Sequence, residues 1–211
     1  MKETIIVIEH LEPFTSKWMF IEIKHSALLA SPYQLWLTNV KRECEREIFS
    51  RYVSKVYRES IIDLSKRLEY DRIIVLDPEA STPLSPTDFE KPNIVIVGGI
   101  MGSYPPEKRT KKFLSEKISQ AIGRNIGKGQ FTINGAIYVL RQVLEGKSLK
   151  EIKTVNGLRI NTIDGEIFLP YTFPLENGKP VIPEEEIVYI RDILPLDEEK
   201  YILEEKIPSI C

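Results

Sequence analysis

The run Asn93–Val97 (NIVIV) is the feature that most restricts the fold of this chain. It is apolar at every position after the first and leads directly into Gly98 and Gly99. A strand without polar alternation is typical of a sheet covered on both faces, and such sheets are usually parallel. Three similar runs accompany it: Thr4–Ile8, Gln34–Thr38 and Arg72–Leu76.

Segments with helical spacing lie between these strands. Ser16 is a suitable residue to cap the first helix, and Thr132 to cap the last. The predicted helices are Ser16–Leu29, Lys41–Val56, Lys108–Ile118 and Ile133–Glu145. A further short strand is expected at Ser60–Asp63, and Ser119–Asn125 is either a short strand or an extended link. Alternating strands and helices predict an α/β fold with a parallel sheet.

The chain changes character near Lys153. Beyond it, Val155–Pro174 is strand-like, with turns expected at Asp164-Gly165 and Asn177-Gly178, and Pro195–Cys211 is an acidic end that we expect to be solvated. We therefore predict a main domain over residues 1–153 and a β-rich extension over 154–211 that packs on it.

The composition excludes several classes of function. The 211 residues carry a net charge of -2, which argues against a protein that holds nucleic acid by general phosphate contacts, although a local basic face is still compatible. No apolar run approaches the ~20 residues of a membrane helix. Cys44 and Cys211 have no metal-ligand spacing, so no metal site is predicted, and such sparse cysteine indicates a reducing, cytosolic setting.

Three loops follow strands at the edge where ligands bind in open α/β sheets. They begin at Leu76, Gly98 and Gly123. The glycines permit close approach of the backbone to a ligand, or they simply form tight turns. Neither the Walker phosphate loop nor the G-x-G-x-x-G fingerprint of dinucleotide sites is present, so ATP and NAD sites have no support.

Polar residues at other positions have two interpretations each. Glu9 and His10 follow the first strand, where they lie either in the cleft or in a surface turn. The basic run from Lys108 to Lys117 forms either a solvated face or a guide for an anionic partner.

Taken together, four segments resemble one family. They are Val7–Glu12 (VIEHLE), Leu76–Pro78 (LDP), Gly98–Thr110 (GGIMGSYPPEKRT) and Arg124–Gln130 (RNIGKGQ). In this order they are similar to SPOUT methyltransferases related to the eukaryotic ribosomal-protein arginine methyltransferase and its archaeal relatives. The resemblance spans about residues 4–183, and its most specific part is Gly98–Thr110.

The resemblance implies a Rossmann-like sheet with a C-terminal trefoil knot, and S-adenosylmethionine as the cofactor. It also favours a monomer, with a homodimer as the alternative. The implied cofactor-binding residues are Leu76, Asp77, Pro78, Gly98, Gly99, Ile100, Gly102, Ile126, Gly127, Gln130, Phe131 and Thr132. The chain departs from the family at Ser103, where an acidic residue is frequent, and at Ile133-Asn134, where Thr-Asp is frequent. Both departures affect the expected substrate more than the expected cofactor.

The methyl acceptor decides which side chains catalysis needs. An arginine has a pKa above ~12 and needs a carboxylate that aligns its guanidinium and accepts a proton late. Glu9 is the first candidate and Asp77 the second. An RNA acceptor would need basic and aromatic groups, such as Arg109 and Tyr104. Arg124 either polarises an acceptor oxygen or braces its loop, and His10, Tyr104 and Arg109 are the predicted substrate-binding residues.

Three functions remain open on these grounds. The first is a cytoplasmic arginine methyltransferase of a ribosomal protein, which the acidic balance and Glu9 favour. The second is a methyltransferase of rRNA or tRNA, which the basic run favours. The third is a non-catalytic module that binds adenosylmethionine, which the departures at Ser103 and Asn134 leave open.

Overall fold

The protein is built on a six-stranded parallel sheet. In the computed structural model, which describes residues 4–102, 109–163 and 165–211, the strand order is β3-β2-β1-β5-β4-β6. The strands are β1 (Thr4–His10), β2 (Gln34–Thr38), β3 (Lys55–Val56), β4 (Arg72–Leu76), β5 (Asn93–Gly99) and β6 (Ala121–Arg124). The apolar run Asn93–Val97 lies in β5, between β1 and β4, which explains the absence of polar alternation. The predicted parallel α/β sheet is confirmed.

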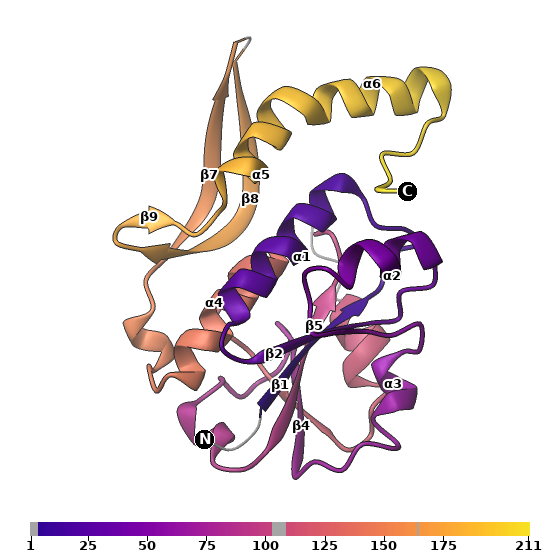
Figure 1. The fold of residues 1–211 in the computed structure, drawn as a ribbon. Coiled ribbons are helices and arrows are strands. Elements are labelled where there is room, and N and C mark those ends of the chain that lie inside the picture. The colour runs from indigo at the N-terminus through magenta and orange to yellow at the C-terminus, as the bar shows by residue number, and fades with distance from the viewer. Residues whose placement is uncertain (1–3, 103–108, 164) are drawn as a thin grey trace.

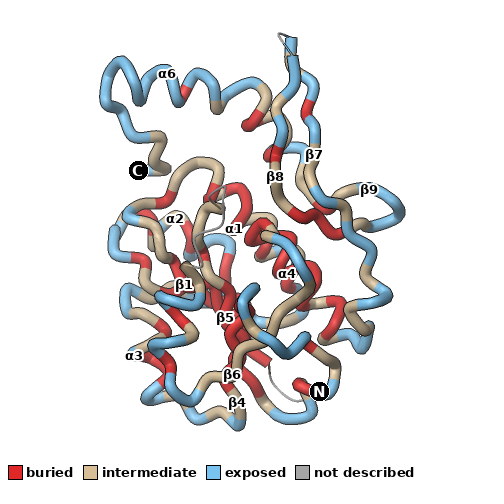
Figure 2. The backbone as a smooth tube through the Cα atoms, turned by 180° about the vertical axis from the view of Figure 1, so that it is seen from behind, coloured by how far each residue is buried: buried red, intermediate tan, exposed pale blue. Residues whose placement is uncertain are grey.

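Helices cover both faces of the sheet (Figure 1). On one face α1 (Lys17–Ala30) and α4 (Ile133–Leu144) pack side by side and share the larger core with α2 (Glu43–Phe49). On the other face α3 (Ile61–Leu64) and η2 (Lys111–Ser115) cover a second core. Figure 2 shows the buried strands at the centre of the main body.

The predicted helix caps at Ser16 and Thr132 are confirmed. The Ser16 side chain accepts a hydrogen bond from the Met19 N–H, and the Thr132 side chain accepts one from the Gly135 N–H. The basic helix expected at Lys108–Ile118 is helical from Arg109 to Ser115 in its described part.

Two predictions around β2 were wrong. The helix expected over Lys41–Val56 ends at Phe49, because Lys55–Val56 forms β3, a strand that pairs with β2. The strand expected at Ser60–Asp63 is the first turn of α3, since Ser60 caps this helix. In both places long-range contacts override the local pattern.

Short helical segments and the extension complete the fold. The short segments are η1 (Pro86–Phe89) and η3 (Leu149–Glu151). The extension consists of β7 (Thr154–Thr162), β8 (Gly165–Glu176), β9 (Lys179–Pro180), α5 (Glu184–Val188), η4 (Tyr189–Ile193) and α6 (Leu194–Glu204). The antiparallel β7–β8 hairpin, with α5 and η4, forms a third apolar cluster that includes Ile21 of α1. The boundary at residue 153 stays a prediction, as does the knot.

The acidic end is held at both of its ends. Asp197 in α6 is buried and forms an ion pair with Lys17 at 2.8 Å. The last residues return to the main body, where Ile210 N–H donates to Thr15 O at 3.1 Å. Between these points the side chains of α6 are largely exposed (Figure 2). The acidic end is therefore solvated along α6, as expected. Its contacts with the main body at both ends hold it in place.

A disulfide joins Cys211 to Cys44 of α2, with a Cα–Cα distance of 6.2 Å. The inference of a reducing setting from these two cysteines therefore loses its basis. They are 167 positions apart, and nothing in the sequence indicated that they would meet. No helix in the described ranges 4–102, 109–163 and 165–211 is long and apolar enough to cross a bilayer.

Candidate functional site

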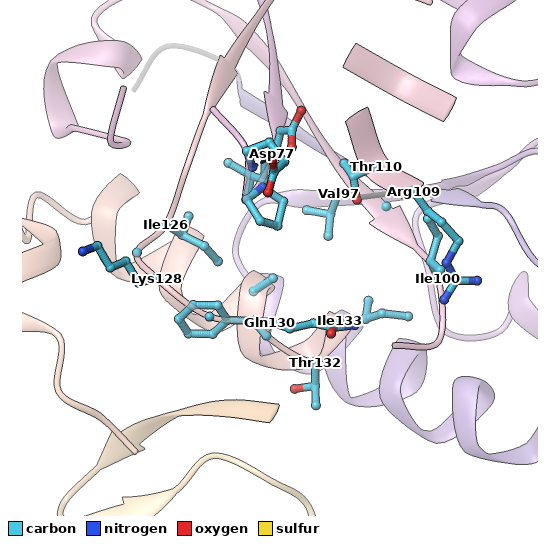
Figure 3. Close-up of a pocket in the computed structure, with 18 residues that line it drawn as sticks. Asp77, Val97, Ile100, Arg109, Thr110, Ile126, Lys128, Gln130, Thr132 and Ile133 are labelled. Atoms are coloured by element: carbon cyan, nitrogen blue, oxygen red, sulfur yellow. Dashed lines mark hydrogen bonds between the residues drawn. The ribbon is translucent and has the colours of Figure 1, made fainter. Parts of the chain in front are cut away.

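A cavity of about 390 Å³ lies at the carboxyl ends of β4, β5 and β6. Its size is within the range of small-molecule sites. Eleven residues predicted for cofactor or substrate binding line it: Leu76, Asp77, Pro78, Gly98, Ile100, Arg109, Ile126, Gly127, Gln130, Phe131 and Thr132. Figure 3 shows Ile100 and Arg109 at one end of the cavity and Ile126 and Lys128 at the opposite end. The parallel sheet thus brings the three predicted loops together.

Glycine is needed in two of these loops for different reasons. A Cβ atom at Gly98 would lie 3.2 Å from the Thr110 hydroxyl, so glycine allows the cavity wall to close here. Gly127 has φ +117°, a conformation that residues with side chains rarely adopt. Gly99 and Gly102 do not line the cavity but flank it.

The remaining lining residues were not among those predicted to bind a ligand, although Thr110, Lys128 and Gly129 lie in the family segments. They are Glu79, Val97, Thr110, Lys128, Gly129, Ile133 and Ala136. Val97 could have been found as the residue before Gly98. Ile133 and Ala136 belong to α4 and were expected only as core residues of a helix.

Asp77 lines the cavity, and its carboxylate shapes the first loop. Oδ1 accepts a hydrogen bond from the Glu79 N–H at 2.9 Å, and Oδ2 accepts one from the Ser115 hydroxyl at 2.5 Å. Both oxygens therefore have protein partners. Their geometry fixes the turn after β4 against η2.

Glu9, the first candidate for catalysis, does not line the cavity. Its Oε2 accepts hydrogen bonds from the Ile61 N–H at 2.9 Å and from the Thr38 hydroxyl, and its Oε1 accepts one from the Ser60 hydroxyl at 2.5 Å. Burial raises the pKa of this carboxyl, and the three hydrogen bonds act in the opposite direction. Glu9 was predicted to follow the first strand, but β1 continues through Glu9 to His10, and the Glu9 side chain turns toward α3 and secures its N-terminus.

His10 and Arg124 are also placed outside the cavity. The His10 ring is buried, with Nε2 2.9 Å from the Thr15 hydroxyl, and burial lowers its pKa. Arg124 donates from Nε and Nη2 to the Asp88 carboxylate, with Nη2 at 2.9 Å from Oδ1. It therefore has the bracing role that was the alternative to catalysis. Tyr104 and Ser103 lie outside the described residues.

A carboxylate that the sequence did not single out lies at the Arg109 end. Glu12 Oε1 accepts a hydrogen bond from the Met101 N–H at 2.9 Å and lies 3.4 Å from Arg109 Nη1. Arg109 also donates from Nη2 to the Met101 carbonyl. Oε2 of Glu12 accepts no hydrogen bond from the described residues, and the side chain is 21% exposed. Glu12 is thus a partly exposed carboxylate next to a residue that lines the cavity.

A second acidic group lies beneath the N-terminus of α4. Glu22 Oε2 accepts a hydrogen bond from the Ile133 N–H at 2.8 Å, and Glu186 Oε2 accepts one from Asn134 Nδ2 at 2.9 Å. Burial and the Glu186 charge raise the pKa of Glu22 well above its ordinary value, and burial raises the pKa of Glu186 to about 7. The described residues contain no cluster of three potential metal ligands.

The family model of the SFM1-like protein arginine N-methyltransferases matches residues 5–195. The chain belongs to this family. The match includes all three loops, the carboxylates of Glu9, Glu12 and Asp77, and most of the extension. The family resemblance expected from the sequence is confirmed.

The chain is similar to a known SFM1-like protein both in sequence and in structure. Protein arginine N-methyltransferase SFM1 of Saccharomyces cerevisiae is 27% identical over 192 residues, which cover 84% of this chain and 90% of the yeast protein. The crystal structure of the yeast enzyme complexed with SAM matches with a TM-score of 0.76 and 25% identity, covering 90% of this chain and 91% of that one.

The fold extends beyond the SFM1-like family. The crystal structure of a dual-specific Trm10 from Thermococcus kodakaraensis matches with a TM-score of 0.56 and 24% identity, covering 72% of this chain and 96% of that chain. This similarity concerns the fold alone. It agrees with the predicted α/β fold built on a parallel sheet.

Proposed function

We propose that this protein transfers a methyl group from S-adenosylmethionine to an arginine side chain of a protein. One observation carries the proposal: the three family loops converge on a single cavity at the carboxyl edge of the sheet. The relative from yeast is an arginine methyltransferase whose structures contain SAM and SAH.

The cavity fits the cofactor in size and in the character of its walls. Apolar side chains such as Leu76, Ile126 and Phe131 suit an adenine ring, and glycine backbone at Gly98 and Gly127 gives close access to main-chain groups. When bound, S-adenosylmethionine supplies an electrophilic methyl group on a sulfonium. The chain itself contributes by holding donor and acceptor in line, which is a proximity effect.

Glu12 replaces Glu9 as the candidate that orients the acceptor. A guanidinium can bind a carboxylate through paired N–H groups, and one oxygen of Glu12 already accepts a single hydrogen bond from Arg109 Nη1. Its second oxygen accepts no hydrogen bond from the described residues, and the side chain is partly exposed next to Arg109, which lines the cavity. Asp77 is less suitable, because both of its oxygens are engaged within its own loop. Glu12 can thus align the substrate arginine and receive its proton late in the transfer.

An RNA acceptor is the second candidate function. The basic residues Arg109, Lys111, Lys112 and Lys117 favour it, as they can contact phosphates. The contacts of Arg109 argue against an RNA acceptor, because its guanidinium already donates to Glu12 and to the Met101 carbonyl. A ribosomal protein as the substrate, a monomeric state and a cytoplasmic location stay predictions.

Labelled adenosylmethionine tests the proposal directly. The purified protein is supplied with methyl-labelled cofactor and with ribosomes and lysate from unmodified cells, and parallel samples are digested with protease or ribonuclease. We expect label that only protease releases and that amino-acid analysis finds on methylarginine. Label released only by ribonuclease would establish the RNA function instead, and no transfer together with cofactor binding would favour a non-catalytic module.

A further inference from the structure

Adjacent residues of β8 hold two loops of the cavity. The Tyr171 hydroxyl donates to the Gly102 carbonyl at 3.1 Å, and the Thr172 N–H donates to the Gln130 carbonyl at 2.8 Å. Gly102 lies in the loop after β5, and Gln130 in the loop before α4. One strand of the extension therefore joins the loop after β5 to the loop before α4.

The contacts at this connection are close on both sides. A Cβ atom at Gly102 would clash with the Tyr171 ring and the Gln130 side chain, and one at Gly129 would clash with the Thr172 hydroxyl. That hydroxyl donates to Asn156 Oδ1 of β7 at 2.8 Å, so both strands of the hairpin contribute to the arrangement. The loops cannot shift relative to β8 without losing these contacts.

We propose that Tyr171 is a positioning residue of the methyl-transfer site, which fixes Gly102 in the loop after β5 against the loop at Gln130 and so couples cofactor binding to docking of the β7–β8 hairpin. The proposal rests on the proposed function for the identity of the cofactor. It gives the extension a part in the site, although no residue of the extension lines the cavity.

The surroundings of Tyr171 keep its hydroxyl protonated. Burial and the Glu22 carboxylate raise its pKa, while the Arg109 charge acts in the opposite direction. A protonated phenol can donate to the Gly102 carbonyl, whereas a phenolate would repel it. The hydrogen bond is therefore available throughout the neutral pH range.

Coupling of this kind is reciprocal. If the hairpin holds the cavity loops in their binding geometry, cofactor binding must in turn stabilise the hairpin. We expect S-adenosylhomocysteine to slow hydrogen exchange of the wild-type amides over residues 168–175, among which the Thr172 amide reports the bond to Gln130 directly.

Tyr171→Phe tests the role of the hydroxyl, with Tyr138→Phe as the matched control. The Tyr138 hydroxyl also joins α4 to β8, by donating to Glu176 Oε1 at 3.2 Å, but Tyr138 does not line the cavity. We expect Tyr171→Phe to weaken S-adenosylhomocysteine binding about 2- to 12-fold, the range of one net hydrogen bond, and to reduce the cofactor-induced protection of residues 168–175. Tyr138→Phe should bind the cofactor like the wild type.

Exchange without cofactor separates this proposal from the proposed function. In Tyr171→Phe, the amide hydrogens of residues 98–102 should exchange faster than in the wild type even when no ligand is present. Faster exchange in a protein that binds no adenosylmethionine would uphold the role of Tyr171 and overturn the proposed cofactor. Unchanged exchange and wild-type affinity in Tyr171→Phe would overturn the role of Tyr171.

Discussion

Asn134 donates a hydrogen bond from Nδ2 to Oε2 of Glu186 at 2.9 Å, which joins α4 of the main body to α5 of the extension. Glu186 Oε1 accepts a second hydrogen bond from Trp18 Nε1 at 3.0 Å. Glu22 lies close enough for its pKa to be raised by the Glu186 charge. Two carboxyl groups are therefore buried at the junction, and binding of a proton by one of them relieves their repulsion.

Stability should fall as the pH rises through the range of this pair. An unfolded glutamate titrates near pH 4.3, whereas the folded pKa of Glu186 is about 7 and that of Glu22 is also raised. The contribution of the pair is fully present below about pH 4.3 and is lost as the pH rises through about 7, because the folded state binds more protons. We expect the pair to lower the free energy of unfolding by about 1–3 kcal/mol between pH 5 and pH 8, since a tenfold change in proton affinity corresponds to about 1.4 kcal/mol.

Glu186→Gln measures this contribution by denaturant unfolding at both pH values. Removing the second charge should reduce the loss of stability between pH 5 and pH 8. Glu185→Gln is the control, since Glu185 is exposed and pairs with Lys24 at the surface. Equal pH dependence in the wild type and in Glu186→Gln would show that the pair does not share a proton.

Glu12→Gln should abolish most transfer to arginine without removing the cofactor. The amide oxygen can still accept the hydrogen bond from the Met101 N–H, whereas the negative charge that aligns a guanidinium is lost. A positioned proton acceptor contributes about 10²- to 10⁴-fold to a rate, so we expect a fall in kcat of at least about 100-fold. Single-turnover transfer and calorimetric binding of S-adenosylhomocysteine measure the two effects. A kcat within about threefold of the wild type would remove Glu12 from the mechanism.

Glu9→Gln should lower the stability of the protein and have little effect on methyl transfer. The carboxylate accepts three hydrogen bonds at the start of α3, and a carboxamide can replace only part of them. Loss of a charge-assisted hydrogen bond costs about 1.5–3 kcal/mol, which corresponds to a lower Tm. Transfer is measured well below the new Tm. If kcat falls while cofactor binding and folding persist, Glu9 acts in catalysis, as first expected from the sequence.

The strands and the cavity loops could be predicted because their signals are local. β2 and β4 occupy the predicted residues, and the glycine loops follow directly from strands whose carboxyl ends must meet in a parallel sheet. At Gly98 and Gly127 the residue type itself indicates the backbone conformation and the close packing that the loops need.

No such local signal predicts where a side chain near the end of a strand will point. Glu9 and Glu12 are three residues apart in one segment, yet one reaches α3 and the other reaches the loop at Met101. The role of Tyr171 depends on how the extension docks, which is a contact across 69 residues of sequence. Tertiary packing decides such contacts, and periodicity does not record them.

Arg124 should matter for stability and only indirectly for transfer. Its guanidinium binds the buried Asp88 carboxylate, so Arg124→Met leaves a buried charge without its main partner. We expect a loss of about 2–4 kcal/mol in the free energy of unfolding, measured by urea titration. Arg72→Met is the control, because Arg72 lies 3.8 Å from the same carboxylate, is 40% exposed and should cost less than about 1 kcal/mol. Equal losses in the two variants would contradict the assignment.

The disulfide should stabilise the protein without affecting the cavity. Cys44 and Cys211 close a loop of 167 residues, and cross-links over long loops typically contribute about 2–5 kcal/mol. The end of the chain keeps other contacts, such as the hydrogen bond from Lys17 N–H to Pro208 O at 3.0 Å, so the double variant Cys44→Ser, Cys211→Ser should fold. We expect a lower Tm in this variant, a similar fall when the wild type is reduced, and unchanged binding of S-adenosylhomocysteine. Alkylation before reduction is the decisive check: thiols that react in the unreduced, denatured wild type would show that the cross-link does not form in solution, and the difference in Tm should then vanish.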